Sequence, residues 1–75
     1  MVMTNLKPED QARIIAIEGG RGIRQKLLLR GISEGSIVRV VSSNGGPVVV
    51  ELDGGMIAIG VGMAQRIRVQ RIGMS

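Results

Sequence analysis

The chain has 75 residues, 44% of them hydrophobic, and ten Lys and Arg outweigh six Asp and Glu to give a net charge of +4. It contains no Cys, no His and no aromatic residue, which excludes a disulfide, a zinc site of thiolates and imidazoles, and base stacking on aromatic rings. This length allows one domain, so residues 1–75 are expected to form a single domain with a core of Ile, Val, Leu, Met and Ala.

The N-terminal stretch, residues 1–11, has no apolar run of signal-peptide length. No segment approaches the ~20 apolar residues needed to span a membrane, so we expect a cytoplasmic protein. The positive charge suits a nucleic acid, an anionic membrane surface or an acidic protein face, and it equally suits solubility alone.

The first elements are expected between residues 12 and 35. Residues 12–18, ARIIAIE, predict a buried strand that ends at a pair of glycines. Residues 21–30, RGIRQKLLLR, are mostly straight-chain residues of high helix propensity and predict a helix. Residues 31–35, GISEG, follow as a turn.

Glycines divide the remainder of the chain into short apolar segments. These segments are rich in β-branched residues, which favours strands, and the Asn-Gly and Asp-Gly pairs between them accept the positive φ angles of tight turns. The expected order is strand 36–42, loop 43–47, strand 48–52, hairpin 53–55, strand 56–61, a short helical turn at 62–66 and strand 67–72.

Five short strands with a helix after the first favour a barrel, because a flat antiparallel sheet would leave two long open edges. We predict a mainly β fold, a small SH3-like five-stranded barrel with one α-helix inserted between strands 1 and 2. An OB-like barrel is the alternative. Its usual helix lies between strands 3 and 4, where this sequence has only short glycine turns.

The end of the predicted helix is marked by Gly31, which accepts the left-handed conformation found just past a helix. Ile32 is then expected to fold back on Leu27. Lys26 and Arg30 lie in the last turn, where positive charge complements the helix dipole. Lys26 and Arg30 can therefore serve either to stabilise the helix end or to bind a partner, and the sequence does not distinguish the two roles.

Three consecutive leucines cannot all face one side of a helix. At ~100° per residue, Ile23 and Leu27 share one arc and are the expected core anchors. Leu28 and Leu29 point further round, so one or both are expected to be exposed beside Arg24, Lys26 and Arg30. The competing interpretation is that one of the two flanks the core edge. An apolar centre with a basic rim suits a protein partner. The predicted partner-binding residues are Arg24, Lys26, Leu28, Leu29 and Arg30.

No hydroxyl residue has a His or Cys to activate it, so we predict that the protein is not an enzyme, with no catalytic residue and no cofactor. Glu51 and Asp53 share a strand face and suit only weak binding of a hard cation, and a solvated strand face is favoured over a metal site. The GGRG stretch at 19–22 lacks the Lys-Ser/Thr of a phosphate-binding loop.

Four motifs in chain order resemble the ferrous iron transport protein A family, FeoA. The family approaches its first strand through L-K-P-G, here LKPED at 6–10, and ends its helix as basic-L-x-x-L-G-I-x-P-G, here KLLLRGISEG at 26–35. Its hairpin carries Gly-Pro and its last motif reads A-x-x-I-x-V, here Ala64, Ile67 and Val69. The turn residues of these motifs are Gly31, Ile32, Gly35, Gly46 and Pro47.

Three positions depart from the family pattern. Glu9 stands where the family usually has Gly, and Glu34 where it often has Pro. Arg30 replaces the second apolar residue of the helix motif, so either its stem covers the core and its head reaches water, or the helix rotates.

The resemblance implies a small cytoplasmic accessory protein of ferrous iron uptake. Such a protein would dock on the cytosolic, GTPase-containing part of the ferrous iron transporter and meet the membrane only indirectly. The resemblance implies transition metal binding for the family as a whole. Because this chain has no His or Cys, we expect it to bind ferrous iron or zinc only weakly. The sequence leaves open whether the protein forms weak homo-oligomers.

Two other functions remain as alternatives. One is a small nucleic-acid-binding barrel that holds phosphates through Arg, with a steep salt dependence. The other is a stand-alone relative of the SH3-like domain of a metal-dependent repressor, here without a preceding helix-turn-helix.

Overall fold

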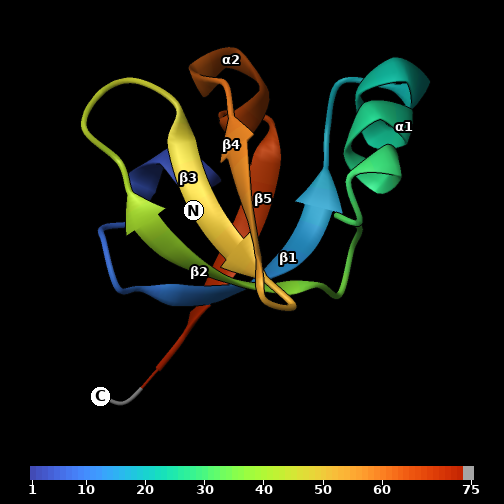
Figure 1. Cartoon of the computed structure of the whole chain (residues 1–75). Helices are drawn as coiled ribbons and strands as arrows, with labels where there is room; N and C mark the ends of the chain where they lie inside the picture. Colours follow the sequence, from blue (N-terminus) through green and yellow to red (C-terminus); the bar gives the residue numbers. More distant parts are fainter. Residues whose placement is uncertain (74–75) are drawn as a thin grey trace.

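A computed structural model describes residues 1–73. It contains five strands, one nine-residue helix and two shorter helical segments (Figure 1). Every strand and helix expected from the sequence is present, with bounds shifted by one or two residues at most of the ends. The elements are η1 (Met3–Asn5), β1 (Gln11–Ile17), α1 (Arg21–Leu29), β2 (Ile37–Ser42), β3 (Val48–Leu52), β4 (Gly55–Ile59), α2 (Val61–Ala64) and β5 (Ile67–Ile72).

The strands form one antiparallel sheet in the order β4-β3-β2-β1-β5. The sheet is strongly bent (Figure 1), and its pairing shifts register between Ile14 and Ala16 and between Val40 and Ser42. Such bulges bend a strand and increase its twist, which lets five short strands wrap around one core. The mainly β prediction, with a helix between strands 1 and 2, is confirmed.

The core consists only of aliphatic side chains and methionine. At the start of β1, Ala12 and Ile14 face inward with the two-residue period of a strand. The bulge between Ile14 and Ala16 then shifts the alternation by one residue, so Ile17 is the next residue that faces inward. The N-terminal segment contributes Met3 and Leu6, and no periodic pattern in the sequence marks these two as core residues. A three-residue 3₁₀ turn is too short to give a periodic pattern.

The hairpin between β3 and β4 is the tight turn that its Asp-Gly pair indicates. Asp53 has φ 52° and Gly54 has φ 83°, and Leu52 pairs with Gly55 across the turn. Positive φ at both central residues is the requirement of the type I′ hairpin turn. In the other hairpin loop, 43–47, the positive φ is carried by Gly45.

Glu9, at the position where the FeoA family usually has Gly, adopts φ 77°. Its N–H donates to the carbonyl of Val40 at 2.8 Å, and its carboxylate accepts from the Arg39 guanidinium at 3.1 Å. The first bond holds the backbone in a conformation that costs a residue with a Cβ roughly 1–2 kcal/mol.

We therefore expect Glu9→Gly to be more stable than Glu9→Ala by about 1 kcal/mol, because only Ala keeps the strained backbone. Both substitutions remove the carboxylate that pairs with Arg39, so each is the control for the other. Thermal melts of the two variants measure the difference. Equal melting temperatures would mean that the backbone at residue 9 relaxes without cost.

Candidate functional site

Helix α1 is attached to the barrel along one narrow side. Leu27 is fully buried and Ile23 is half-buried against the core, while the rest of the helix is exposed. Gly19 permits this approach, because a Cβ there would lie only 2.7 Å from the Cδ1 of Ile23. Figure 1 shows α1 standing at the side of the barrel, beside the end of β1. The outward face of the helix is therefore available to a partner.

The helix ends in a Schellman motif. Gly31 has φ 85° and donates its N–H to the carbonyl of Leu28, and the N–H of Ile32 donates to the carbonyl of Leu27, both at 2.9 Å. These two bonds satisfy carbonyls that the helix end would leave free. Ile32 is fully buried, which fixes the orientation of the last helical turn.

The remaining predicted turn residues lie in two loops. Gly35 has φ 94° and donates its N–H to the carbonyl of Ile14 at 2.7 Å, so it ties the helix exit to β1. Gly46 and Pro47 lie in the loop that precedes β3. Gly46 and Pro47 are remote in sequence from the helix surface, whereas Gly35 follows the helix directly.

Leu28 and Leu29, the two leucines whose exposure the sequence left open, are both exposed. The exposed fraction is 61% for Leu28 and 88% for Leu29. Leu28 also lines a cavity of about 100 Å³ between the helix and the barrel. The cavity is bounded by Ile17, Arg24, Leu28, Ile32, Ser33 and Glu34. The two leucines thus form an apolar surface that continues into a shallow hollow.

The three basic residues predicted around the leucines differ in their contacts. Arg24 forms an ion pair with Glu34, so the residue that replaces the family's Pro supplies a counter-charge. The Arg30 guanidinium donates to the carbonyl of Ala58 on β4 at 3.1 Å. Lys26 forms no ion pair with any residue in 1–73. Of the three, only Arg24 has a counter-charge within residues 1–73, and only Lys26 forms neither a side-chain hydrogen bond nor an ion pair with the rest of the described chain.

The two carboxylates considered as a weak cation site do not act together. The sheet register places Arg39 opposite Glu51, and the guanidinium donates to the Glu51 carboxylate at 2.7 and 3.1 Å. This hydrogen bond raises the pKa of Arg39. Asp53 sits in the adjacent turn. Within residues 1–73, no three acidic side chains are grouped as metal ligands would be.

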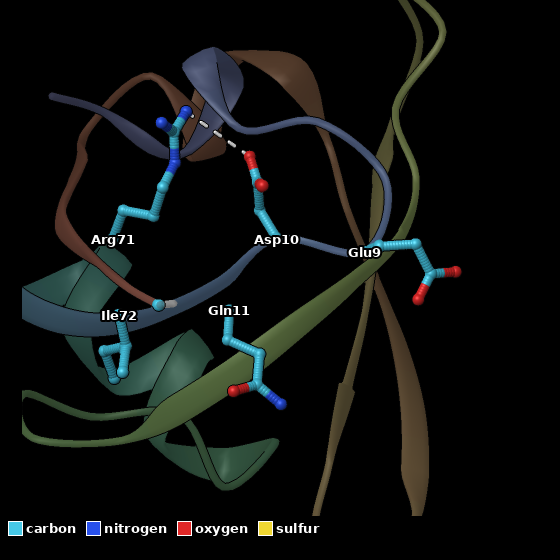
Figure 2. Close-up of a pocket in the computed structure, with 6 residues that line it drawn as sticks. Glu9, Asp10, Gln11, Arg71 and Ile72 are labelled. Atoms are coloured by element: carbon cyan, nitrogen blue, oxygen red, sulfur yellow. Dashed lines mark ion pairs between the residues drawn. The ribbon is translucent and has the colours of Figure 1, made fainter. Parts of the chain in front are cut away.

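A larger hollow, of about 320 Å³, lies between the N-terminal segment and the end of β5. Asp10 pairs there with Arg71 at 3.4 Å and also accepts the N–H of Lys7 at 2.8 Å. Figure 2 shows the Glu9 carboxylate directed away from this pair. Asp10 and Arg71 are bound to each other and Glu9 is bound to Arg39, so the size of the hollow alone does not make it a ligand site.

Within residues 1–73, each helix is too short to cross a lipid bilayer.

Comparison with known proteins agrees with the fold. The family model FeoA domain matches residues 1–71. A protein of Methanocaldococcus jannaschii provisionally named Fe(2+) transport protein A is 36% identical over 64 residues, which cover 85% of this chain and 78% of that protein. A crystal structure of an iron uptake regulatory protein, FeoA, superposes with a TM-score of 0.88 at 32% identity, covering 96% of each chain.

A manganese-dependent transcriptional repressor also superposes, with a TM-score of 0.86 at 22% identity, over 95% of this chain and 40% of the repressor. That likeness shows a shared fold and no more. The SH3-like fold predicted from the sequence is confirmed. The family model across residues 1–71 and the 36% identical relative together show that this chain belongs to the FeoA family.

Proposed function

We propose that this chain is a non-catalytic accessory protein of ferrous iron transport. In this proposal it docks through α1 on the cytosolic, GTPase-containing part of a ferrous iron transporter. Membership of the FeoA family supports the role in iron uptake, as do the names of the relatives, Fe(2+) transport protein A and iron uptake regulatory protein.

One observation carries the choice of docking surface, namely that Leu28 and Leu29 are both exposed at the end of the helix. The core does not need them, because Leu27 and Ile32 already fill the interior there. A polar residue at either position would leave the fold intact. Two adjacent exposed leucines beside Lys26 are the composition of an interface centre with a polar rim.

The contacts of the basic residues favour a protein partner over a nucleic acid. Phosphate binding depends on free Lys and Arg side chains. In this patch the charge of Arg24 is compensated by Glu34, and one N–H of Arg30 is used by the carbonyl of Ala58. The sequence has no aromatic residue on which a base could stack.

We expect Leu28→Ala and Leu29→Ala, tested separately, to weaken capture of the transporter's purified cytosolic domain by about 1–2 kcal/mol or more. The free energy of unfolding should change by no more than about 0.5 kcal/mol, because both side chains are in solvent. Met56→Ala is the matched control, since Met56 is 66% exposed and lies on β4. Capture and thermal melting are measured on the same preparations.

The same variants are tested for binding to random-sequence RNA at two salt concentrations. If RNA binding is strong at low salt, is lost on Lys26→Ala and is insensitive to both leucine substitutions, the surface is one for nucleic acid. If both leucine variants capture the transporter domain at parental strength, α1 is not the docking face.

A further inference from the structure

The strand β4 is an uncharged strand at one end of the sheet. Residues 55–61, GMIAIGV, contain no charged residue and no Pro, and β4 pairs with β3 alone. Its free edge therefore presents backbone groups to solvent. Such an edge is a template for pairing with another chain, and proteins usually protect it with a charge, a Pro or a covering side chain.

The register shows which groups face outward. In an antiparallel ladder the residues alternate between those bonded to the neighbouring strand and those whose N–H and C=O point away from it. The two-residue turn is closed by the pair Leu52 and Gly55, which exchange bonds, so the non-bonded positions of β4 include Ala58. The carbonyl of Ala58 accepts a bond from Arg30 instead. Met56, two residues earlier on the same strand, has the same orientation. Both residues are exposed.

Among the hydrogen bonds formed within residues 1–73, the bond from Arg30 is the one by which a side chain of another element reaches this edge. It comes from the end of α1, 28 residues earlier in the chain. The side chain is exposed and contributes nothing to the core. The substitution of Arg for the family's apolar residue thus coincides with a contact that covers the edge of β4.

We propose that Arg30 prevents β4 from pairing with β4 of a second copy of this chain. The edge is complementary to itself: with a two-fold axis at Ile57, Met56 of each copy lies opposite Ala58 of the other. Each such pair exchanges two N–H···O bonds, which gives four across the interface. No charge on β4 opposes this pairing. The bond from Arg30 occupies the Ala58 carbonyl, which the pairing requires.

The test compares self-association of the parent and Arg30→Ala by sedimentation equilibrium over a wide concentration range. Removing the guanidinium frees a carbonyl on each of two copies, so we expect association to tighten by about tenfold or more. Lys26→Ala is the control for the lost charge, because Lys26 lies on the same helix without an ion pair in residues 1–73. It should associate as the parent does.

A second substitution identifies the surface. Met56→Lys places a charge on the edge, a device that natural edge strands use, and it should return Arg30→Ala to parental association. In amide exchange, Met56 and Ala58 should gain protection in Arg30→Ala as its concentration rises. If melting shows that Arg30→Ala is partly unfolded, Arg30→Leu replaces it, since Leu restores the family's apolar residue.

Two results would overturn the proposal. The first is that Arg30→Ala and Arg30→Leu both associate no more tightly than the parent. The second is tighter association that persists in the presence of Met56→Lys, since the contact would then lie on another surface.

Discussion

Leu27→Ala is expected to lower the free energy of unfolding by about 2–5 kcal/mol, because the substitution leaves a cavity in a core that cannot fully collapse. The Leu27 side chain has no exposed surface, and it is the only fully buried side chain of α1. At ~0.05–0.15 kcal/mol per residue, a domain of this size has a total stability of roughly 4–11 kcal/mol. The substitution should therefore remove a large fraction of the total stability and lower the melting temperature steeply.

Leu29→Ala is the matched control. It removes the same atoms from the same helix, two residues later, at a position that is 88% exposed. Its effect should stay within about 0.5 kcal/mol. Urea titration of both variants gives the two free energies on one scale. Similar small losses for both would show that the helix packs on the barrel through a different face.

Gly31→Val is expected to cost about 1–3 kcal/mol, because a β-branched residue is forced into the left-handed region. Gly31 has φ 85°, and the bonds from Gly31 and Ile32 to the helix end depend on that angle. Steric crowding is not the cause, since the nearest atom to an added Cβ would be Leu52 Cδ2 at 4.0 Å.

Gly22 provides the comparison for this substitution. It lies inside α1, its φ is not positive, and nothing lies within 4 Å of an added Cβ. Gly22→Ala should be neutral or stabilising by up to about 1 kcal/mol, whereas Gly31→Ala should destabilise. Thermal melts of Gly22→Ala and Gly31→Ala measure this difference in stability. An unchanged melting temperature for Gly31→Val would mean that the helix end does not need the left-handed residue.

The local features of the fold were accessible from the sequence because each depends on nearby residues. Helical spacing was enough to separate Leu27 from Leu29, and glycine positions were enough to find the turns. The contacts of the basic residues were not accessible. Arg24 meets Glu34 and Arg30 meets Ala58 across 10 and 28 residues, so they depend on how the helix is placed on the barrel.

For two charged residues, the sequence suggested a role that differs from the contact found in the structure. Glu51 was considered with Asp53, its neighbour on the strand, although its contact is Arg39 on the paired strand. Setting out the register of the hairpin 36–52 would have shown this pair, since opposite charges across a strand pair stabilise a sheet. In the sequence, Glu34 is notable only as a departure from the family's Pro, whereas in the structure its carboxylate is the partner of Arg24.

The central claim, that α1 docks on the transporter through its exposed leucines, is tested most directly by methyl NMR. The chain has only five leucines, so each methyl signal can be followed while the transporter's cytosolic domain is added. We predict that the signals of Leu28 and Leu29 shift or broaden, while those of the buried Leu6 and Leu27 respond far less. Changes at Met56 or Ile37, with Leu28 and Leu29 unaffected, would contradict the account.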